Sequence, residues 1–132
     1  MLRALTAGLL ILCAPRIVDA STLLTNPVLV VTPTTLDFGR VATNATASKT
    51  FLVENIGGGK LVGTATVAAP FKILSGGDYT LRENDAQVVT VIYKPTGAAA
   101  DTQTVQFTGG GGAKATATGK LETDPPKKPK RR

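Results

Sequence analysis

Short apolar runs broken by turn residues recur along most of this sequence, and this pattern limits the folds open to it. Between residues 28 and 119 the breaks carry Pro, Gly or Asn, and apolar and polar residues alternate in the runs between them. The alternation is clearest at Phe51 and Val53, from Val89 to Tyr93, and at Val105 and Phe107. A two-residue repeat is typical of strands with one buried face. No window carries a sustained helical stripe with caps, so the sequence predicts an all-β chain.

The spacing of the runs predicts how many strands there are and which side chains they bury. Many short strands separated by turn residues favour an antiparallel β-sandwich of about seven to nine strands. We expect strands near residues 28–32, 36–38, 49–55, 63–67, 71–74, 79–81, 87–93, 102–108 and 114–119. The side chains expected to face inward between the two sheets are Phe51, Val53, Val89, Val91, Tyr93 and Phe107.

The first twenty residues have the features of a signal peptide. Arg3 supplies a positive start, an apolar run follows from Leu5 to Cys13, and Val18-Asp19-Ala20 offers a small-residue cleavage site. We therefore expect export to the periplasm, the cell surface or the exterior. Cleavage after Ala20 would remove Cys13, the only cysteine. Lipidation at Cys13 is an alternative that the sequence leaves open.

The remaining residues divide into a lead-in, one domain and a tail. Residues 21–27 form a short polar lead-in, residues 28–120 the sandwich, and residues 121–132 a tail rich in proline and like charges. Such a tail cannot build a core, so we expect it to be disordered.

Positive charge is concentrated in that tail. The formal net charge is +6, yet residues 21–120 hold eight Lys and Arg against six Asp and Glu, whereas residues 121–132 hold five against two. Two interpretations are open: the tail attaches to an anionic surface such as lipid headgroups or an envelope polymer, or it only keeps the chain in solution. The residues that would make the electrostatic contact are Lys127, Lys128, Lys130, Arg131 and Arg132.

A glycine-rich stretch, Gly57-Gly58-Gly59-Lys60, raises the question of a phosphate-binding loop. That motif needs two glycines separated by four residues and followed by Lys and then Ser or Thr. Here Leu61 follows Lys60, the glycine spacing differs, and strand-like sequence lies on both sides. We therefore expect a turn between strands, in which glycine supplies unusual backbone angles.

The sequence lacks several residue types that enzymes commonly use for catalysis. The chain has no His, and the expected mature chain has no Cys, so the usual general base, thiol nucleophile and transition-metal ligands are missing. The acidic residues fall at expected turns and strand ends. We expect a non-catalytic protein without a cofactor, a metal or a small-molecule substrate. Aromatic residues are not interleaved with Lys and Arg as they are on surfaces that bind nucleic acid, so we do not expect nucleic acid as a partner. The acidic residues considered are Asp37, Glu54, Asp78, Glu83, Asp85 and Asp101.

Several segments together resemble a known domain family. They are Leu36-Asp37-Phe38-Gly39, Phe51 to Asn55 with the glycines after it, Pro70 to Ile73, Val89 to Tyr93 with Pro95, and Phe107 to Gly110. This combination resembles the immunoglobulin-like domain of the abnormal-spindle and hydin (ASH) type, which is common in bacterial exported choice-of-anchor D proteins. The resemblance covers residues 28–120.

The resemblance implies a non-catalytic interaction or structural module of the cell envelope or exterior. A protein partner would be held at a sheet edge or at the loops that close the sandwich. Three alternatives remain: a tail-driven accessory protein that binds anionic polymer or membrane, a pilus-chaperone-like factor, and an intracellular cytoskeletal or ciliary ASH-type module.

Overall fold

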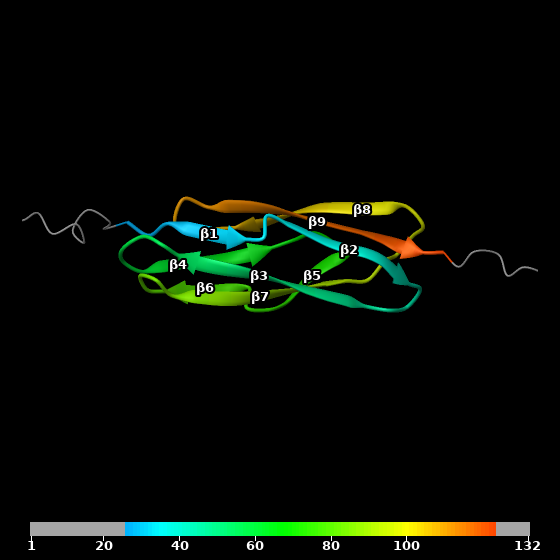
Figure 1. The fold of residues 1–132 in the computed structure, drawn as a ribbon, viewed down its shortest axis with the longest axis horizontal. Helices are drawn as coiled ribbons and strands as arrows, with labels where there is room; N and C mark the ends of the chain where they lie inside the picture. Colours follow the sequence, from blue (N-terminus) through cyan, green and yellow to red (C-terminus); the bar gives the residue numbers. More distant parts are fainter. Residues whose placement is uncertain (1–25, 124–132) are drawn as a thin grey trace, which may run out of the picture.

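Two β-sheets packed face to face build residues 26–123, the part of the chain that the computed structural model describes (Figure 1). Sheet I has the strand order β1 (Leu29–Thr32), β3 (Ala47–Asn55), β7 (Ala86–Tyr93) and β5 (Phe71–Ser75). Sheet II has the order β2 (Thr35–Ala42), β9 (Ala113–Glu122), β8 (Ala100–Phe107), β4 (Leu61–Thr66) and β6 (Asp78–Leu81). Within residues 26–123 there is no helix that could cross a membrane.

All nine expected strands are present, with shifted ends, and the all-β immunoglobulin-like sandwich is confirmed. Two details differ from the sequence-based expectation. β2 runs parallel to β9, whereas the other strand pairs are antiparallel. β9 also continues to Glu122, two residues into the expected tail, because Leu121 and Glu122 pair with Val41 and Ala42 of β2.

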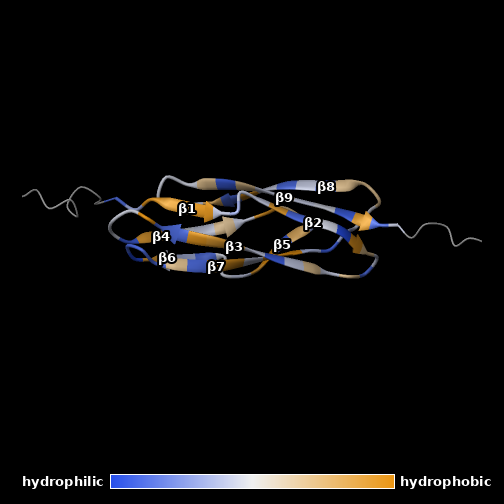
Figure 2. Ribbon diagram, in the orientation of Figure 1, coloured by the Kyte–Doolittle hydropathy of each residue, from blue (hydrophilic) through white to orange (hydrophobic). Residues whose placement is uncertain are grey.

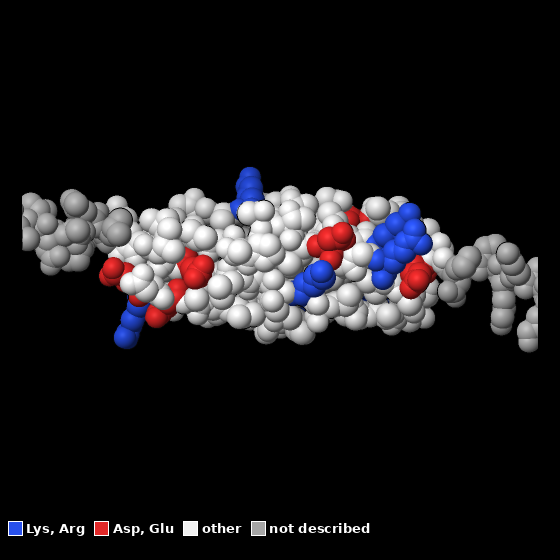
Figure 3. All heavy atoms as spheres, in the orientation of Figure 1, with Lys and Arg blue, Asp and Glu red and all other residues white. Residues whose placement is uncertain are grey.

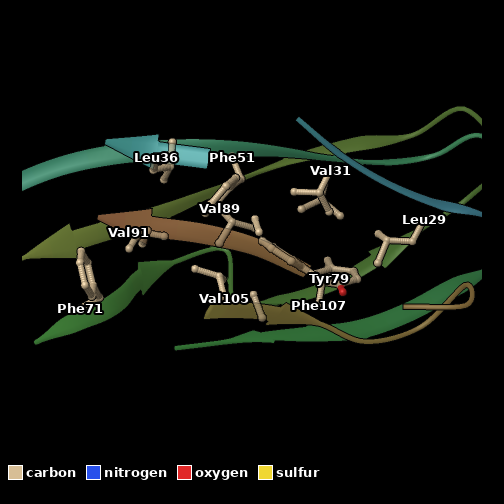
Figure 4. Packing of buried hydrophobic residues seen from close by; sticks show 14 of the residues in the cluster. Leu29, Val31, Leu36, Phe51, Phe71, Tyr79, Val89, Val91, Val105 and Phe107 are labelled. Carbon is tan, nitrogen blue, oxygen red and sulfur yellow. The ribbon is translucent and has the colours of Figure 1, made fainter. Parts of the chain in front are cut away.

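The core lies between the sheets and follows the two-residue repeat, which Figure 2 shows as alternating hydropathy along the strands. All six side chains expected to face inward are buried; five of them have no exposed surface and Phe107 is 3% exposed. Strands of both sheets contribute, as Phe51, Val89 and Val105 illustrate in Figure 4. The predicted strand register is therefore confirmed at these positions.

Aromatic rings from the two sheets meet at two places in this core. Phe51 of β3 meets Phe107 of β8 edge to face, with 5.3 Å between ring centroids. Tyr93 of β7 stacks on Phe71 of β5 at 4.7 Å. The Tyr93 ring reaches β9 where a Cβ on Gly119 would lie only 2.7 Å from ring carbons. Glycine at position 119 is thus required by the close approach of the ring.

Asn55 at the end of β3 is a buried polar residue whose side chain fixes the glycine-rich stretch. Its carbonyl oxygen accepts the N–H groups of Val28 and Gly57, each at 3.1 Å. Its amide nitrogen donates to the carbonyl oxygens of Gly59 at 3.2 Å and Leu81 at 3.4 Å. These bonds join Val28 at the start of the sandwich, the glycine loop and the end of β6, and they satisfy a polar group that would otherwise be costly to bury.

The glycine-rich stretch itself is a turn between β3 and β4, as the sequence predicted. Gly59 has a φ of 71°, in the left-handed region that favours glycine. A side chain on Gly57 would collide with the backbone of Asn26 and Val28. Strand β4 follows directly at Leu61. The glycines therefore allow backbone segments to approach each other, and the geometry is not that of a phosphate loop.

Candidate binding surface

The predicted electrostatic residues of the tail, Lys127, Lys128, Lys130, Arg131 and Arg132, lie outside the described residues. The predicted signal peptide and the basic tail are therefore untested by the fold. Within residues 26–123, no three His, Cys, Asp or Glu side chains are grouped as metal ligands would be.

Two of the acidic residues of the sandwich, Asp37 and Asp85, make local structural contacts. Asp37 accepts the N–H of Gly39 at 2.8 Å, and Asp85 accepts the N–H of Arg82 at 3.0 Å. Both bonds close tight bends of the backbone, a common role of Asp side chains. These two carboxylates are thus used in shaping bends.

Asp101 on β8 has a different partner, because the Tyr93 hydroxyl donates to its carboxylate at 2.7 Å. Burial first, and then the hydrogen bond to Asp101 and the negative charge of that residue, together raise the pKa of Tyr93 to about 12. A phenol with so high a pKa keeps its proton at neutral pH and is a poor base. The pair links sheet I to sheet II.

The outer face of sheet II is covered largely by threonine. In the strand register Thr35 lies beside Thr116, Thr116 beside Thr104, and Thr118 beside Thr102. Threonine combines high strand propensity with a hydroxyl that water can solvate. This face has the character of a solvated sheet surface.

The outer face of sheet I is more apolar. Leu52 of β3 and Val88 of β7 lie directly opposite each other, and they are 38% and 52% exposed. Leu74, which is 60% exposed, lies at the irregularity in the register of β5. The outer face of sheet I thus carries three exposed apolar side chains, and Val62 of β4 in sheet II is 61% exposed as well.

Each sheet has two edges, and backbone hydrogen bonds show how available three of them are. At β1 the outward N–H of Leu29 donates to the carbonyl oxygen of Gly110 at 3.2 Å. At β2 the register shifts between Asp37 and Arg40, where Asp37 takes the Gly39 N–H. β6 has only four residues. Short strands, bulges and covering loops all make an edge a poor template for another strand.

Strand β5 leaves the outward backbone groups of Ile73 open, whereas the outward N–H of Phe71 donates to the carbonyl oxygen of Ala68 at 3.2 Å. The N–H of Lys94 donates to the Pro70 carbonyl oxygen at 3.3 Å, and bonding residues alternate along an antiparallel pair. Lys72 is therefore bonded to β7, whereas the N–H and C=O of Ile73 point away from the sheet. No turn or loop backbone among residues 26–123 bonds to Ile73.

A shallow groove of about 450 Å³ lies beside this edge. Its surface is mostly apolar, and its floor includes Phe71, which is only 3% exposed and is fixed by its stacking on Tyr93. The residues that line it are Ala69, Pro70, Phe71, Lys72, Ile92, Lys94 and Thr96. An open edge and an apolar groove thus lie side by side, which is the combination that binding of an extended peptide requires.

The sandwich has no large region of a single charge on the face shown in Figure 3, where acidic and basic side chains are interspersed. The groove differs from this mixture of acidic and basic side chains, because its lining includes two lysines and no carboxylate. The β5 edge is therefore locally cationic on a domain that is close to neutral.

Comparison with known proteins gives similarity in structure and not in sequence. No model of a known protein family matches the chain, and no curated protein matches it significantly. PapD-like domain 7 of human CEP192, an ASH domain, superposes with a TM-score of 0.62 and 13% identity over 76% of this chain and 89% of that domain. The fold is that of an ASH/PapD-like domain.

Bacterial proteins contain the same ASH/PapD-like fold. A Porphyromonas gingivalis W83 protein of unknown function has a TM-score of 0.64 and 14% identity over 74% of this chain and 48% of that one. The CupB2 chaperone of Pseudomonas aeruginosa has a TM-score of 0.55 and 13% identity over 70% and 55%. The chain thus spans about half the length of these two bacterial proteins. Two other similar structures are enzymes, but the match covers only 32% and 20% of their chains.

Sequence reasoning placed the contact surface of this sandwich domain at a sheet edge or at the end loops, without naming the edge. The groove was missed because its two walls are distant in sequence: Pro70 precedes β5 and Lys72 lies in it, and Ile92 and Lys94 lie at and just after the end of β7. The sequence feature that could have indicated the groove is Pro70, because it directly precedes a strand that carries the exposed Lys72.

Proposed function

We propose that this chain is an exported, non-catalytic immunoglobulin-like module that binds an extended segment of a protein partner along the free edge of β5. The observation that carries the proposal is the outward N–H and C=O of Ile73 beside the apolar groove. A partner strand would bond to these groups, and one of its side chains would cover the groove. Backbone bonds supply affinity in this mode, and side-chain pockets supply specificity.

Three further observations support a binding role. The groove floor is held rigid by the core, so little order has to be created on binding. The β1 edge is already bonded at Leu29 and β6 has only four residues, whereas β5, which is five residues long and shifts register after Ile73, differs from the bulged β2 in having the apolar groove beside it. Some proteins with this fold are chaperones, such as CupB2. A pilus-chaperone-like role is a narrower version of the same proposal, because those chaperones also work by strand addition.

The tail-driven role is the alternative from another class. In it, Lys127 and the other basic residues of the tail would attach the chain to an anionic polymer or membrane, and the sandwich would only carry the tail. Salt would then weaken attachment strongly, because exposed charges are screened beyond about 8 Å at physiological ionic strength. The intracellular ASH-type role differs from both in location and predicts that the chain keeps its first twenty residues.

A proline scan of two edges tests the proposal. Residues 21–132 are immobilised, a partner from the envelope fraction of the native host is identified and purified, and its affinity is measured for a set of variants. Ile73→Pro removes the outward N–H and should abolish binding. Thr80→Pro is the matched control: the Ala65 N–H bonds to Gly77, so Thr80 of β6 also points outward, but on an edge without the groove.

Deletion of residues 124–132, which removes all five basic residues of the tail and leaves β9 complete to Glu122, completes the set. We expect the shortened chain to bind the partner as the intact chain does and to tolerate salt. Circular dichroism must show that each variant is folded. The proposal is wrong if Thr80→Pro and Ile73→Pro weaken binding equally, or if the tail deletion alone removes it.

A further inference from the structure

Apolar and cationic side chains alternate along each of the two chain segments that border the groove, and each cationic residue lies opposite an apolar one on the other segment. In the register of β5 and β7, Lys72 lies opposite Ile92, and the bond between Pro70 and Lys94 places these two residues opposite each other. Lys72 and Lys94 are therefore diagonal neighbours, and such positions are about 7–8 Å apart in an antiparallel pair, with their Cβ atoms somewhat closer. The two apolar residues occupy the other diagonal.

Neither lysine has a carboxylate among the residues that line the groove. Both side chains are exposed, so their stems can lie along the apolar surface while their ammonium groups stay in water. An incoming carboxylate would find two cations within reach and no acidic competitor in the groove. An incoming cation would meet repulsion from both.

We propose that the strand accepted at β5 is acidic, with a carboxylate opposite Lys72 and an apolar side chain, two residues away, opposite Pro70. This inference rests on the proposed strand addition and adds the chemistry of the partner. Residues two apart on a strand share a face, so the two side chains would both lie over the groove. Opposite charges on neighbouring strands attract, and like charges repel.

A peptide suits the site better than a fatty acid does, although both can offer an anion and an apolar part. An acyl chain cannot bond to the outward N–H and C=O of Ile73, whereas a peptide backbone satisfies both. The groove is also open and shallow along a strand, and an extended peptide matches that shape.

Two fluorescent eight-residue peptides test the proposal by fluorescence polarisation with the chain from residue 21 to 132. The acidic peptide alternates threonine on one face with glutamate and valine on the other, and the basic peptide replaces each glutamate with lysine. At low salt we expect the acidic peptide to bind about tenfold more tightly, because exposed ion pairs are individually weak and several contacts add. The preference should shrink at high salt.

Charge reversal in the protein gives the control. Lys72→Glu combined with Lys94→Glu should invert the preference between the peptides. Lys114→Glu, an exposed lysine on β9 in sheet II, should leave the preference unchanged. Dodecanoate serves as a competitor and should not displace the acidic peptide.

The outcomes separate this inference from the proposed function. If both peptides bind equally and Ile73→Pro abolishes both, strand addition stands and the acidic preference is wrong. If dodecanoate displaces the peptide, or if it binds where neither peptide does, the site takes acyl chains and the inference is wrong. If neither peptide binds, the inference is again wrong, and the partner measurement with the proline variants alone decides the proposed function.

Discussion

Tyr93 joins the core to the far sheet through a single hydroxyl. Its ring has no exposed surface and stacks on Phe71, while its O–H donates to Asp101 on the opposite sheet. The phenol must stay protonated to make this bond, because an ionised oxygen beside the Asp101 carboxylate would be repelled by it. The residue therefore links the stability of the sandwich to high pH.

The Tyr93 link predicts how stability changes in alkali. The pKa of Tyr93 is raised from 10.0 to about 12 in the folded chain. A raised pKa means that the folded state holds the proton more tightly, so its stabilising effect is fully present below pH 10 and is lost as the pH rises toward 12. Urea unfolding at several pH values should show this loss in the wild type and a smaller one in Tyr93→Phe.

The comparison of the two proteins isolates Tyr93, because burial also raises the pKa of Tyr79, and Tyr79 is present in both. Near neutral pH, Tyr93→Phe should cost about 2 kcal/mol, the value of a hydrogen bond to a charged group. Identical alkaline profiles for the two proteins would show that the Tyr93 hydroxyl is solvated and does not link the sheets.

At the scale of the elements, the burial of Phe51 predicts how much β3 contributes to the stability of the packed sheets. Its ring is fully buried and meets Phe107 across the core. Phe51→Ala should lower the free energy of unfolding by about 3–5 kcal/mol, because it removes apolar contact and leaves a cavity. The exposed Leu52 on the same strand gives the control, and Leu52→Ala should cost far less. An unchanged denaturation midpoint in Phe51→Ala would contradict the packing.

Most elements could be predicted from the sequence because each half-buried strand carries its own two-residue pattern. The inward orientation of Phe51, Val89 and Val105 can be predicted before any partner strand is known. Pairing could not be read in the same way, since the pattern shows which side of a strand is buried and not which strand lies beside it. The parallel β2–β9 pair and the extension of β9 to Glu122 follow from such pairing.

The burial of Asn55 and the presence of the groove could not be predicted from the sequence, for related reasons. Asn55 ends a predicted strand next to glycines, so it resembled an ordinary turn residue, and its partners Val28 and Leu81 are distant in the chain. The groove depends on the alignment of β5 with the end of β7. Both features arise when segments far apart in sequence meet, and local composition carries little trace of that.

For the whole molecule, the proposed export predicts the start of the mature chain. Residues 1–20 lie outside the described part, and Val18-Asp19-Ala20 is the motif that motivates cleavage. Intact-mass measurement of protein from the native host should give a chain beginning at Ser21 with no lipid. A mass that includes Met1 would favour the intracellular alternative, and a chain beginning at an acylated Cys13 would indicate membrane anchoring.

The parallel pairing of β2 with β9 also has a mechanical consequence. The described chain enters at one end of the elongated sandwich and leaves at the other (Figure 1), and β2 and β9 are neighbours along most of their length. Tension applied between the two ends would pull these strands in opposite directions along their axes. Their hydrogen bonds would then share the load and would have to break together, whereas a hairpin pulled open from its end loses them singly. This parallel pairing therefore predicts that the described domain resists stretching along its long axis.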